Sequence, residues 1–255
     1  MTPLNEQTLI ILSRVTIEED KIFLTCGQLD RKQYLAVNEV LENMGGKWNR
    51  KVKAHMFDSD PTERLESVLL TGEIIPPKKF GFFPTPPHIA KQIVELAEIK
   101  PYHRVLEPSA GKGDIIKFIP ECEKLDCVEL LPDNIAELQS LGMSPFEGDF
   151  LSLYLNPNYD RIVANPPFSY EGHPQADIDH VNHMWGCLAS EGRLVSIMSA
   201  GVLFRENKKT TAFRELVNEC GYMERLEEGS FKESGTKVNT VIVVMNKGNW
   251  EILKP

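Results

Sequence analysis

The sequence predicts an α/β protein, a sheet with helices on both faces, preceded by a small α+β module. Strand-length apolar runs alternate with helical patterns after residue 80, and such alternation is typical of a sheet covered by helices. Two unusual loops, 107–114 and 165–168, each follow a predicted strand. The proline pair Pro76-Pro77 separates this part from a shorter N-terminal stretch, because paired prolines interrupt a helix.

Length and composition fit a globular protein. The chain has 255 residues, 42% of them hydrophobic, which suits one large domain with a small appendage. It contains neither an apolar run of about 18 residues nor a secretory pattern, so we expect a cytoplasmic protein without a membrane span. Its five scattered cysteines form no C-x-x-C pair, which predicts free thiols.

The net charge of −9 is distributed unevenly. Residues 1–80 sum to −1 and residues 81–255 to −8. Such a chain is not a bulk nucleic-acid coat protein, although a local basic patch would allow nucleic-acid binding. A patch of that kind follows a Gly-Gly turn and consists of Lys47, Trp48, Arg50, Lys51 and Lys53. Aromatic and basic side chains together suit base stacking and phosphate contact, and a solvated turn is the alternative.

The N-terminal stretch contains short predicted elements. The apolar runs at 10–15 and 22–26 predict strands. Helical spacing predicts a helix over 31–44 that ends at a Gly-Gly pair, and a second helix over 61–70 that begins after Asp60. We expect a domain boundary near residue 80, with a module over 1–79 and a larger domain over 80–255.

The larger domain alternates between strands and helices. Strands are predicted over 104–106, 124–128, 161–164, 193–198 and 238–245, and helices over 86–98, from the first loop to 119, and over 132–141, 178–189 and 210–220. Ligands of such sheets bind beyond the carboxyl ends of the strands. The two loops at strand ends are therefore the candidate site.

The first loop reads Glu-Pro-Ser-Ala-Gly-Lys-Gly-Asp over 107–114. Its glycines let a ligand approach the backbone, and the amides that follow can donate hydrogen bonds. The loop lacks the third glycine of a dinucleotide fingerprint and the final G-K-[ST] of a P-loop. Glu107 at the strand end suits an ammonium or hydroxyl group better than a phosphate. A plain strand–helix turn is the alternative.

The second loop is Asn165-Pro166-Pro167-Phe168. Its two prolines remove backbone donors and stiffen the chain. The Asn165 side-chain carbonyl and the Pro166 backbone carbonyl can accept both hydrogens of one NH2 group, so that the nitrogen lone pair faces an electrophile. Phe168 offers a flat face for stacking a base. The alternative is a rigid turn without a catalytic role.

Four more segments extend this pattern. Phe83-Pro84-Thr85-Pro86 precedes the glycine loop, and Glu129 follows the predicted strand over 124–128. Asp149 lies in Gly148-Asp149-Phe150, and Phe231 lies in a late Gly- and Ser-rich stretch. In this order, over about residues 80–246, the motifs resemble the class I S-adenosylmethionine-dependent methyltransferases of the N6-adenine type. The N-terminal stretch is similar to modules on such enzymes of phages and mobile elements.

The resemblance implies a Rossmann-like class I methyltransferase sheet and S-adenosylmethionine as cofactor. The implied catalytic residues are Asn165, Pro166, Pro167 and Phe168. The implied cofactor contacts are Phe83, Thr85, Glu107, Pro108, Ala110, Gly111, Gly113, Glu129, Asp149, Phe150 and Asn165. Within the family pattern, the acid at 129 takes the ribose hydroxyls and the acid at 149 lies near the cofactor adenine. Expected substrate contacts are Phe168 and Phe231, together with the basic patch Lys47, Trp48, Arg50, Lys51 and Lys53.

The expected substrate is nucleic acid, with adenine N6 in DNA favoured over RNA. Methylation of RNA at adenine N6 or guanine N2, methylation of a protein glutamine, and a catalytically silent nucleic-acid binder remain alternatives. Few residues follow the last strand, so we expect target recognition from 1–80, 169–179 or 204–211. His173, His180 and His183 lack a convincing set of partner ligands, and no metal is expected.

Overall fold

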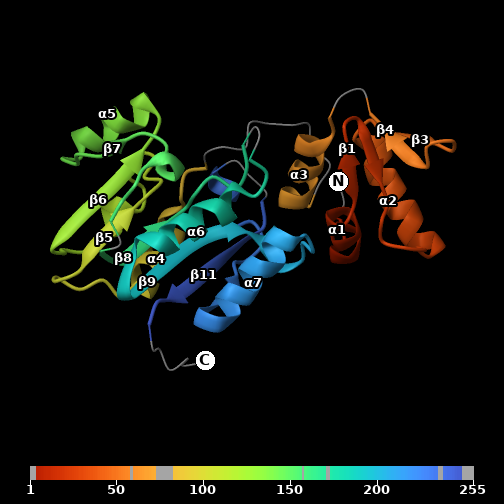
Figure 1. The fold of residues 1–255 in the computed structure, drawn as a ribbon. Helices are drawn as coiled ribbons and strands as arrows, with labels where there is room; N and C mark the ends of the chain where they lie inside the picture. Colours follow the sequence, from red (N-terminus) through yellow and green to blue (C-terminus); the bar gives the residue numbers. More distant parts are fainter. Residues whose placement is uncertain are drawn as a thin grey trace.

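The structure is a computed structural model that describes residues 4–57, 60–72, 83–156, 158–170, 173–234 and 238–248. It contains a seven-stranded sheet with flanking helices and a smaller four-stranded sheet with three helices beside it (Figure 1). The expected boundary near residue 80 lies outside the described residues.

The larger sheet has the strand order β10-β11-β9-β8-β5-β6-β7. Its strands are β5 (Arg104–Glu107), β6 (Lys124–Glu129), β7 (Phe146–Glu147), β8 (Tyr159–Ala164), β9 (Leu188–Ser199), β10 (Gly221–Arg225) and β11 (Thr240–Asn246). β5 to β9 pair in parallel, whereas β11 runs antiparallel to both β9 and β10. The carboxyl ends of β5, β6 and β8 therefore meet at one edge of the sheet.

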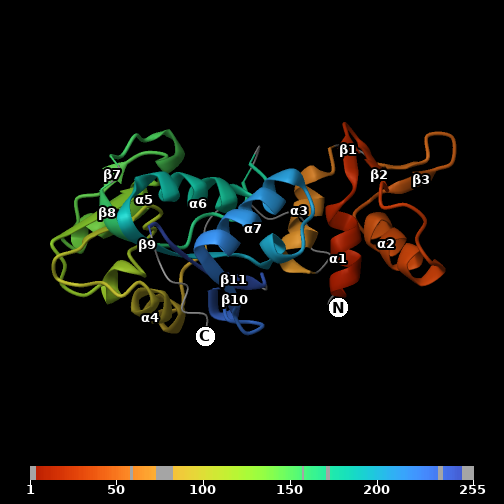
Figure 2. The same ribbon diagram turned by 60° about the horizontal axis from the view of Figure 1, so that its bottom comes forward.

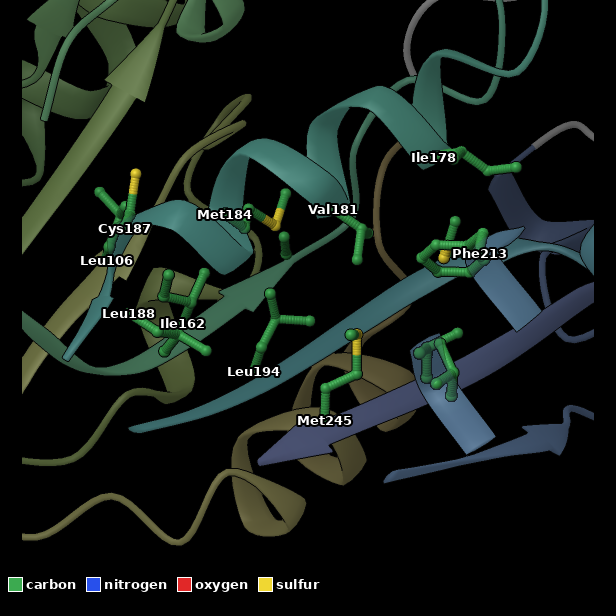
Figure 3. Packing of buried hydrophobic residues seen from close by; sticks show 14 of the residues in the cluster. Leu106, Ile162, Ile178, Val181, Met184, Cys187, Leu188, Leu194, Phe213 and Met245 are labelled. Atoms are coloured by element: carbon green, nitrogen blue, oxygen red, sulfur yellow. The ribbon is translucent and has the colours of Figure 1, made fainter. Parts of the chain in front are cut away.

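Helices cover both faces of this sheet, as the sequence predicts. They are α4 (Pro87–Leu96), α5 (Pro132–Ser140), α6 (Ala176–Cys187) and α7 (Lys208–Cys220). Apolar residues of α6 and α7 pack on one face, where Val181, Met184 and Phe213 meet strand residues such as Leu194 and Met245 (Figure 3). Ile89 and Ile93 of α4 belong to the cluster on the opposite face. The α/β fold class is confirmed.

The N-terminal part has its own sheet, in the order β1-β2-β4-β3, and its own core. Its elements are α1 (Glu6–Ser13), β1 (Thr16–Glu18), β2 (Lys21–Phe23), α2 (Arg31–Asn43), β3 (Lys47–Asn49), β4 (Ala54–Met56) and α3 (Thr62–Thr71). Asp30 and Gln33 form a capping box at the start of α2. Asp60 accepts the Thr62 amide at 2.8 Å, which places the start of α3 one residue after the predicted position.

Two predicted elements are corrected, and several observed strands were not predicted. Residues 10–15 were expected as a strand, but they belong largely to α1, whose Asn5 cap accepts the Thr8 amide at 2.9 Å. The expected helix up to residue 119 is a series of turns with one short 3-10 helix, η1 (Ile116–Phe118). The strands without a counterpart in the prediction are β1, β3, β4, β7 and β10.

Three consecutive residues of the larger part bind the N-terminal part. They follow β9 and the short helix η3 (Ala200–Leu203). Phe204 is 8% exposed and packs in the core of the N-terminal part. Arg205 is 2% exposed and pairs with Glu66 of α3 at 2.7 Å, and Glu206 pairs with Arg14 at the surface. Both views show the N-terminal part beside α7, at the opposite end of the molecule from β6 and β7 (Figures 1 and 2).

The five cysteines are free thiols, as predicted, and Cys127 and Cys187 are buried. Within the described ranges, no helix is long and apolar enough to cross a membrane.

Candidate functional site

The glycine loop connects β5 to η1 at the carboxyl edge of the sheet. Gly111 and Gly113 have φ angles of 53° and 77°, a left-handed backbone that favours glycine. A Cβ at Gly113 would also lie 2.8 Å from Leu141 Cδ1. The two glycines therefore shape the turn and let it approach the end of α5.

Glu107 is a buried carboxyl group at the end of β5. Its side chain is 1% exposed, and Oε2 has no hydrogen-bond partner among the described residues. Burial, and then the nearby carboxylates of Asp114 and Glu129, raise the pKa of Glu107 well above its usual range. Because an unpaired buried carboxyl is costly, this atom suits a cationic or hydroxyl group of a ligand. The residues present therefore fit the ammonium group of S-adenosylmethionine.

Glu129 fastens the glycine loop to the end of β6. Its Oε2 accepts the Gly111 amide at 2.7 Å, and its Oε1 accepts the amides of Leu130 and Leu131 at 2.8 and 2.7 Å. A carboxylate offers about four acceptor positions, so one remains for a ligand hydroxyl. The place of Glu129 at the end of β6 suits the expected contact with ribose hydroxyls, and that role stays a prediction.

Asp149 follows β7 and begins the short helix η2 (Phe150–Ser152). Its carboxylate accepts the Leu151 amide at 3.0 Å. Phe150 is 3% exposed and packs against the rings of His180 and His183 of α6. Phe150 therefore joins the turn to the core, and the cofactor roles expected of residues 149 and 150 stay predictions.

The Asn-Pro-Pro-Phe loop begins where β8 ends, and β8 is the direct parallel neighbour of β5. The fold thus brings the second predicted loop beside the first. Asn165 is half-buried, and its Nδ2 donates to the Phe83 carbonyl at 3.1 Å and to Thr85 Oγ1 at 3.0 Å. Both amide hydrogens are then used, which leaves Oδ1 as the group that can accept hydrogen bonds from a ligand.

The two predicted stacking rings are buried. Phe168 is 2% exposed and Phe231 1%, and both lie in the same apolar cluster. The Phe168 ring also lies 6.1 Å from that of Phe83, between centroids. Neither ring offers an open face here, so stacking on a base requires that they be uncovered when the substrate binds.

The basic patch lies on the hairpin of β3 and β4. Lys47, Arg50, Lys51 and Lys53 are exposed, and Trp48 is 40% exposed. The Trp48 ring lies 5.1 Å from His55, and Asn49 Oδ1 accepts two amides of the turn. The patch therefore presents its cations at an exposed strand edge and turn, far from the seven-stranded sheet (Figure 1).

The histidines of α6 bond to backbone carbonyls. His180 Nδ1 donates to Ala176 at 2.9 Å, and His183 Nε2 donates to Leu153 at 3.0 Å. Burial lowers the pKa of His180. No group of three or more potential ligands that could hold a metal occurs within the part of the chain described here.

The sequence did not indicate a buried polar network beside the second loop. Asp177, at the start of α6, is 1% exposed and accepts the Ser199 amide at 3.0 Å. Burial raises its pKa to about 6, although Arg205 lowers it. The network joins the helix that follows the Asn-Pro-Pro-Phe loop to β9 and, through Arg205 and Glu66, to α3. Its members lie far apart in the sequence, so no local pattern could have identified them.

Comparison with known proteins gives one match to a family model, over slightly less than half of the chain. The N-6 DNA Methylase family model matches residues 132–254. No curated protein sequence matches the chain.

Solved structures resemble much of the chain at low identity. A Listeria monocytogenes protein assigned to the class I S-adenosylmethionine-dependent methyltransferases aligns with TM-score 0.53 and 16% identity, over 67% of this chain and 62% of that one. The methyltransferase subunit of a type I restriction-modification system from Streptococcus thermophilus aligns with TM-score 0.55 and 21% identity, over 68% of this chain and 46% of that one.

The M protein of the type I restriction enzyme EcoKI aligns over 94% of this chain and 57% of its own length, with TM-score 0.57 and 17% identity. This chain therefore spans less than two thirds of the length of each of these three structures. The fold is that of the class I S-adenosylmethionine-dependent methyltransferases.

Proposed function

We propose that this chain is an S-adenosylmethionine-dependent methyltransferase that methylates adenine N6 in DNA. One observation carries the proposal. The glycine loop and the Asn-Pro-Pro-Phe loop leave adjacent parallel strands, and the Asn165 amide is held with its carbonyl free to accept an amino group. The match of residues 132–254 to the N-6 DNA Methylase family model supports adenine N6 as the acceptor.

The cofactor is S-adenosylmethionine, which supplies an electrophilic methyl group. Glu107 would take the ammonium group with its unpaired Oε2, and Glu129 would take a ribose hydroxyl while it accepts the Gly111 amide. Asp149 and Phe150, which follow β7, would contact the adenine end of the cofactor. These assignments follow the pattern of the family that the sequence resembles, and the buried, unpaired Oε2 of Glu107 supports the first of them.

Asn165 and the Pro166 carbonyl orient the target amino group. Each accepts one hydrogen, so the nitrogen lone pair points toward the methyl donor. As the C–N bond formed, the methyl–sulfur bond would break and S-adenosylhomocysteine would leave. The two acceptors would stabilise the positive charge that moves from sulfur to nitrogen, and the nitrogen would then release one proton to water. Orientation and charge stabilisation therefore supply most of the rate enhancement. An adenine within a duplex is flipped out of the base stack to reach the site.

The N-terminal part contributes to DNA binding through the basic patch of β3 and β4. The larger part is acidic, and a polyanion associates slowly with an acidic surface. The exposed cations of the hairpin offset that charge locally, and the exposed Trp48 ring can stack on a base. A particular relation to enzymes of phages and mobile elements stays a prediction.

Methyl transfer from radiolabelled S-adenosylmethionine tests the proposal. Oligonucleotides of DNA and of RNA and a glutamine-containing peptide are offered in parallel. We expect label in DNA as N6-methyladenine, and none when every adenine is replaced by purine, which lacks the amino group. Label that enters only RNA or the peptide would contradict the proposed substrate, and no transfer to any of them would contradict the activity.

A further inference from the structure

We propose that Thr85 is a positioning residue that fixes the side-chain amide of Asn165, rather than a contact of the cofactor. The inference rests on the proposed function and assigns Thr85 a role different from the one that its motif implies. Thr85 is 7% exposed, and its Oγ1 lies 3.0 Å from Asn165 Nδ2. The hydroxyl oxygen of Thr85 is therefore engaged with the catalytic loop.

The orientation of the amide follows from the partner atoms. The Phe83 backbone carbonyl can only accept, and it lies 3.1 Å from the Asn165 amide. An amide turned by 180° would place Asn165 Oδ1 against that carbonyl, where two acceptors repel each other. The nitrogen therefore faces Phe83, and the second hydrogen goes to Thr85.

Thr85 is needed because the Phe83 carbonyl binds only one of the two hydrogens. Without Oγ1 the other hydrogen would lack this partner in a half-buried position, and a missing partner there is costly. The segment itself is held firmly, since proline residues flank Thr85 and Ser234 Oγ donates to the Pro84 carbonyl at 2.7 Å. A stiff segment can fix the amide with little loss of conformational freedom on binding.

The fixed amide also selects the chemical class of the base that accepts the methyl group. With its nitrogen bound on the inner side, Asn165 offers a carbonyl oxygen to the substrate, and that oxygen requires an N–H donor. A turned amide would present hydrogens and would suit a keto group instead. The Phe83 carbonyl sets this orientation and Thr85 holds it, so together they favour an amino-bearing base over a carbonyl-bearing one.

Two substitutions test the role of Thr85. Thr85→Val keeps the shape of the side chain but removes the acceptor, whereas Thr85→Ser retains it. We expect T85V to lower kcat for methyl transfer about 10- to 100-fold, the range for a small misplacement of a catalytic group. The Kd for S-adenosylmethionine should stay within about twofold of wild type, since no cofactor hydrogen bond is lost. T85S should restore most of the activity.

A weaker Kd for the cofactor in T85V, with kcat retained, would identify Thr85 as a cofactor contact and overturn the inference. Unchanged kcat and Kd would overturn it as well. Hydrogen exchange of the Asn165 side-chain NH2, followed by NMR, gives a result that does not depend on activity. We expect faster exchange in T85V than in wild type and T85S, and equal rates would contradict the role. Absence of transfer by the wild type would refute the proposed function. The comparison of NH2 exchange rates would still decide the role of Thr85, because it does not require activity.

Discussion

Asn165 is the residue whose replacement separates binding from chemistry. Asn165→Ala removes the acceptor for the target amino group and leaves Glu107, Glu129 and the glycine loop in place. We expect transfer to fall by at least about 100-fold, as when a single preorganised group is removed from an oxyanion hole. Affinity for S-adenosylmethionine should be nearly unchanged, which titration calorimetry measures.

A matched control is Asn182→Ala, because Asn182 is exposed on α6. It should behave as wild type in both assays. Wild-type turnover in N165A would mean that the Asn-Pro-Pro-Phe loop is a structural turn.

Glu129 combines two roles in one carboxylate. Glu129→Ala removes the expected ribose contact and also three backbone hydrogen bonds, including that of Gly111. We expect cofactor binding to weaken by about 1.5–3 kcal/mol, the value of charge-assisted hydrogen bonds. Calorimetric titration measures the change. Glu137→Ala is the control, since Glu137 forms only an exposed ion pair with Lys112 nearby. Equal affinity of E129A and E137A would remove Glu129 from the cofactor site.

At the scale of elements, Asp177 links the start of α6 to the end of β9. Its pKa of about 6 in the folded state exceeds the usual value of 3.8. The folded state therefore binds the proton more tightly than the unfolded chain. The contribution of Asp177 to stability is complete below about pH 4 and is lost as pH rises through 6.

The pH dependence of stability tests this link. From pH 4 to pH 7 the advantage of wild type over Asp177→Asn should shrink by roughly 2–3 kcal/mol, the equivalent of two pKa units. Urea denaturation at each pH measures both free energies of unfolding. A difference that stays constant over this range would show that Asp177 does not titrate there.

Most elements of the larger domain could be predicted, because buried strands of a parallel sheet are continuous apolar runs with clear loop punctuation. The apolar run Thr-Leu-Ile-Ile-Leu of α1 was predicted wrongly as part of a strand. So short a run does not show whether its apolar residues follow the helical or the strand period. The glycine loop and the Asn-Pro-Pro-Phe loop could be predicted because glycine and proline mark turns and loops in a sequence. The bonds of Asn165 to Phe83 and Thr85 span 82 and 80 residues, and only the folded chain reveals them.

At the scale of the whole molecule, charge is distributed unevenly: the catalytic part is acidic, and the hairpin of β3 and β4 is basic. Reversal of Lys51 and Lys53 to Glu should lower affinity for DNA and make the salt dependence of log K less steep by about 2, because fewer counterions are released. Methylation of a short single strand at saturating concentration should persist. Mobility shifts across a salt series measure both quantities.

Arg31→Glu combined with Lys32→Glu provides the control for this reversal. This variant changes the net charge by the same amount. Its two positions are the exposed first residues of α2, which also belongs to the N-terminal part. Its effect on affinity should be clearly smaller than that of the hairpin variant. Equal affinities and salt slopes for wild type and the hairpin variant would assign the patch to solvated surface.

The position of Phe204 bears on how the protein is made. A ribosome synthesises residues 4–72 before residue 204, yet their apolar core includes the ring of Phe204. Domains generally fold as units in the order of synthesis. Here the core of residues 4–72 stays incomplete until β9 and the residues after it have emerged. The early part of the chain therefore depends on the later one to complete its folding, and apolar side chains of α1 and α3 stay exposed to chaperones during that interval.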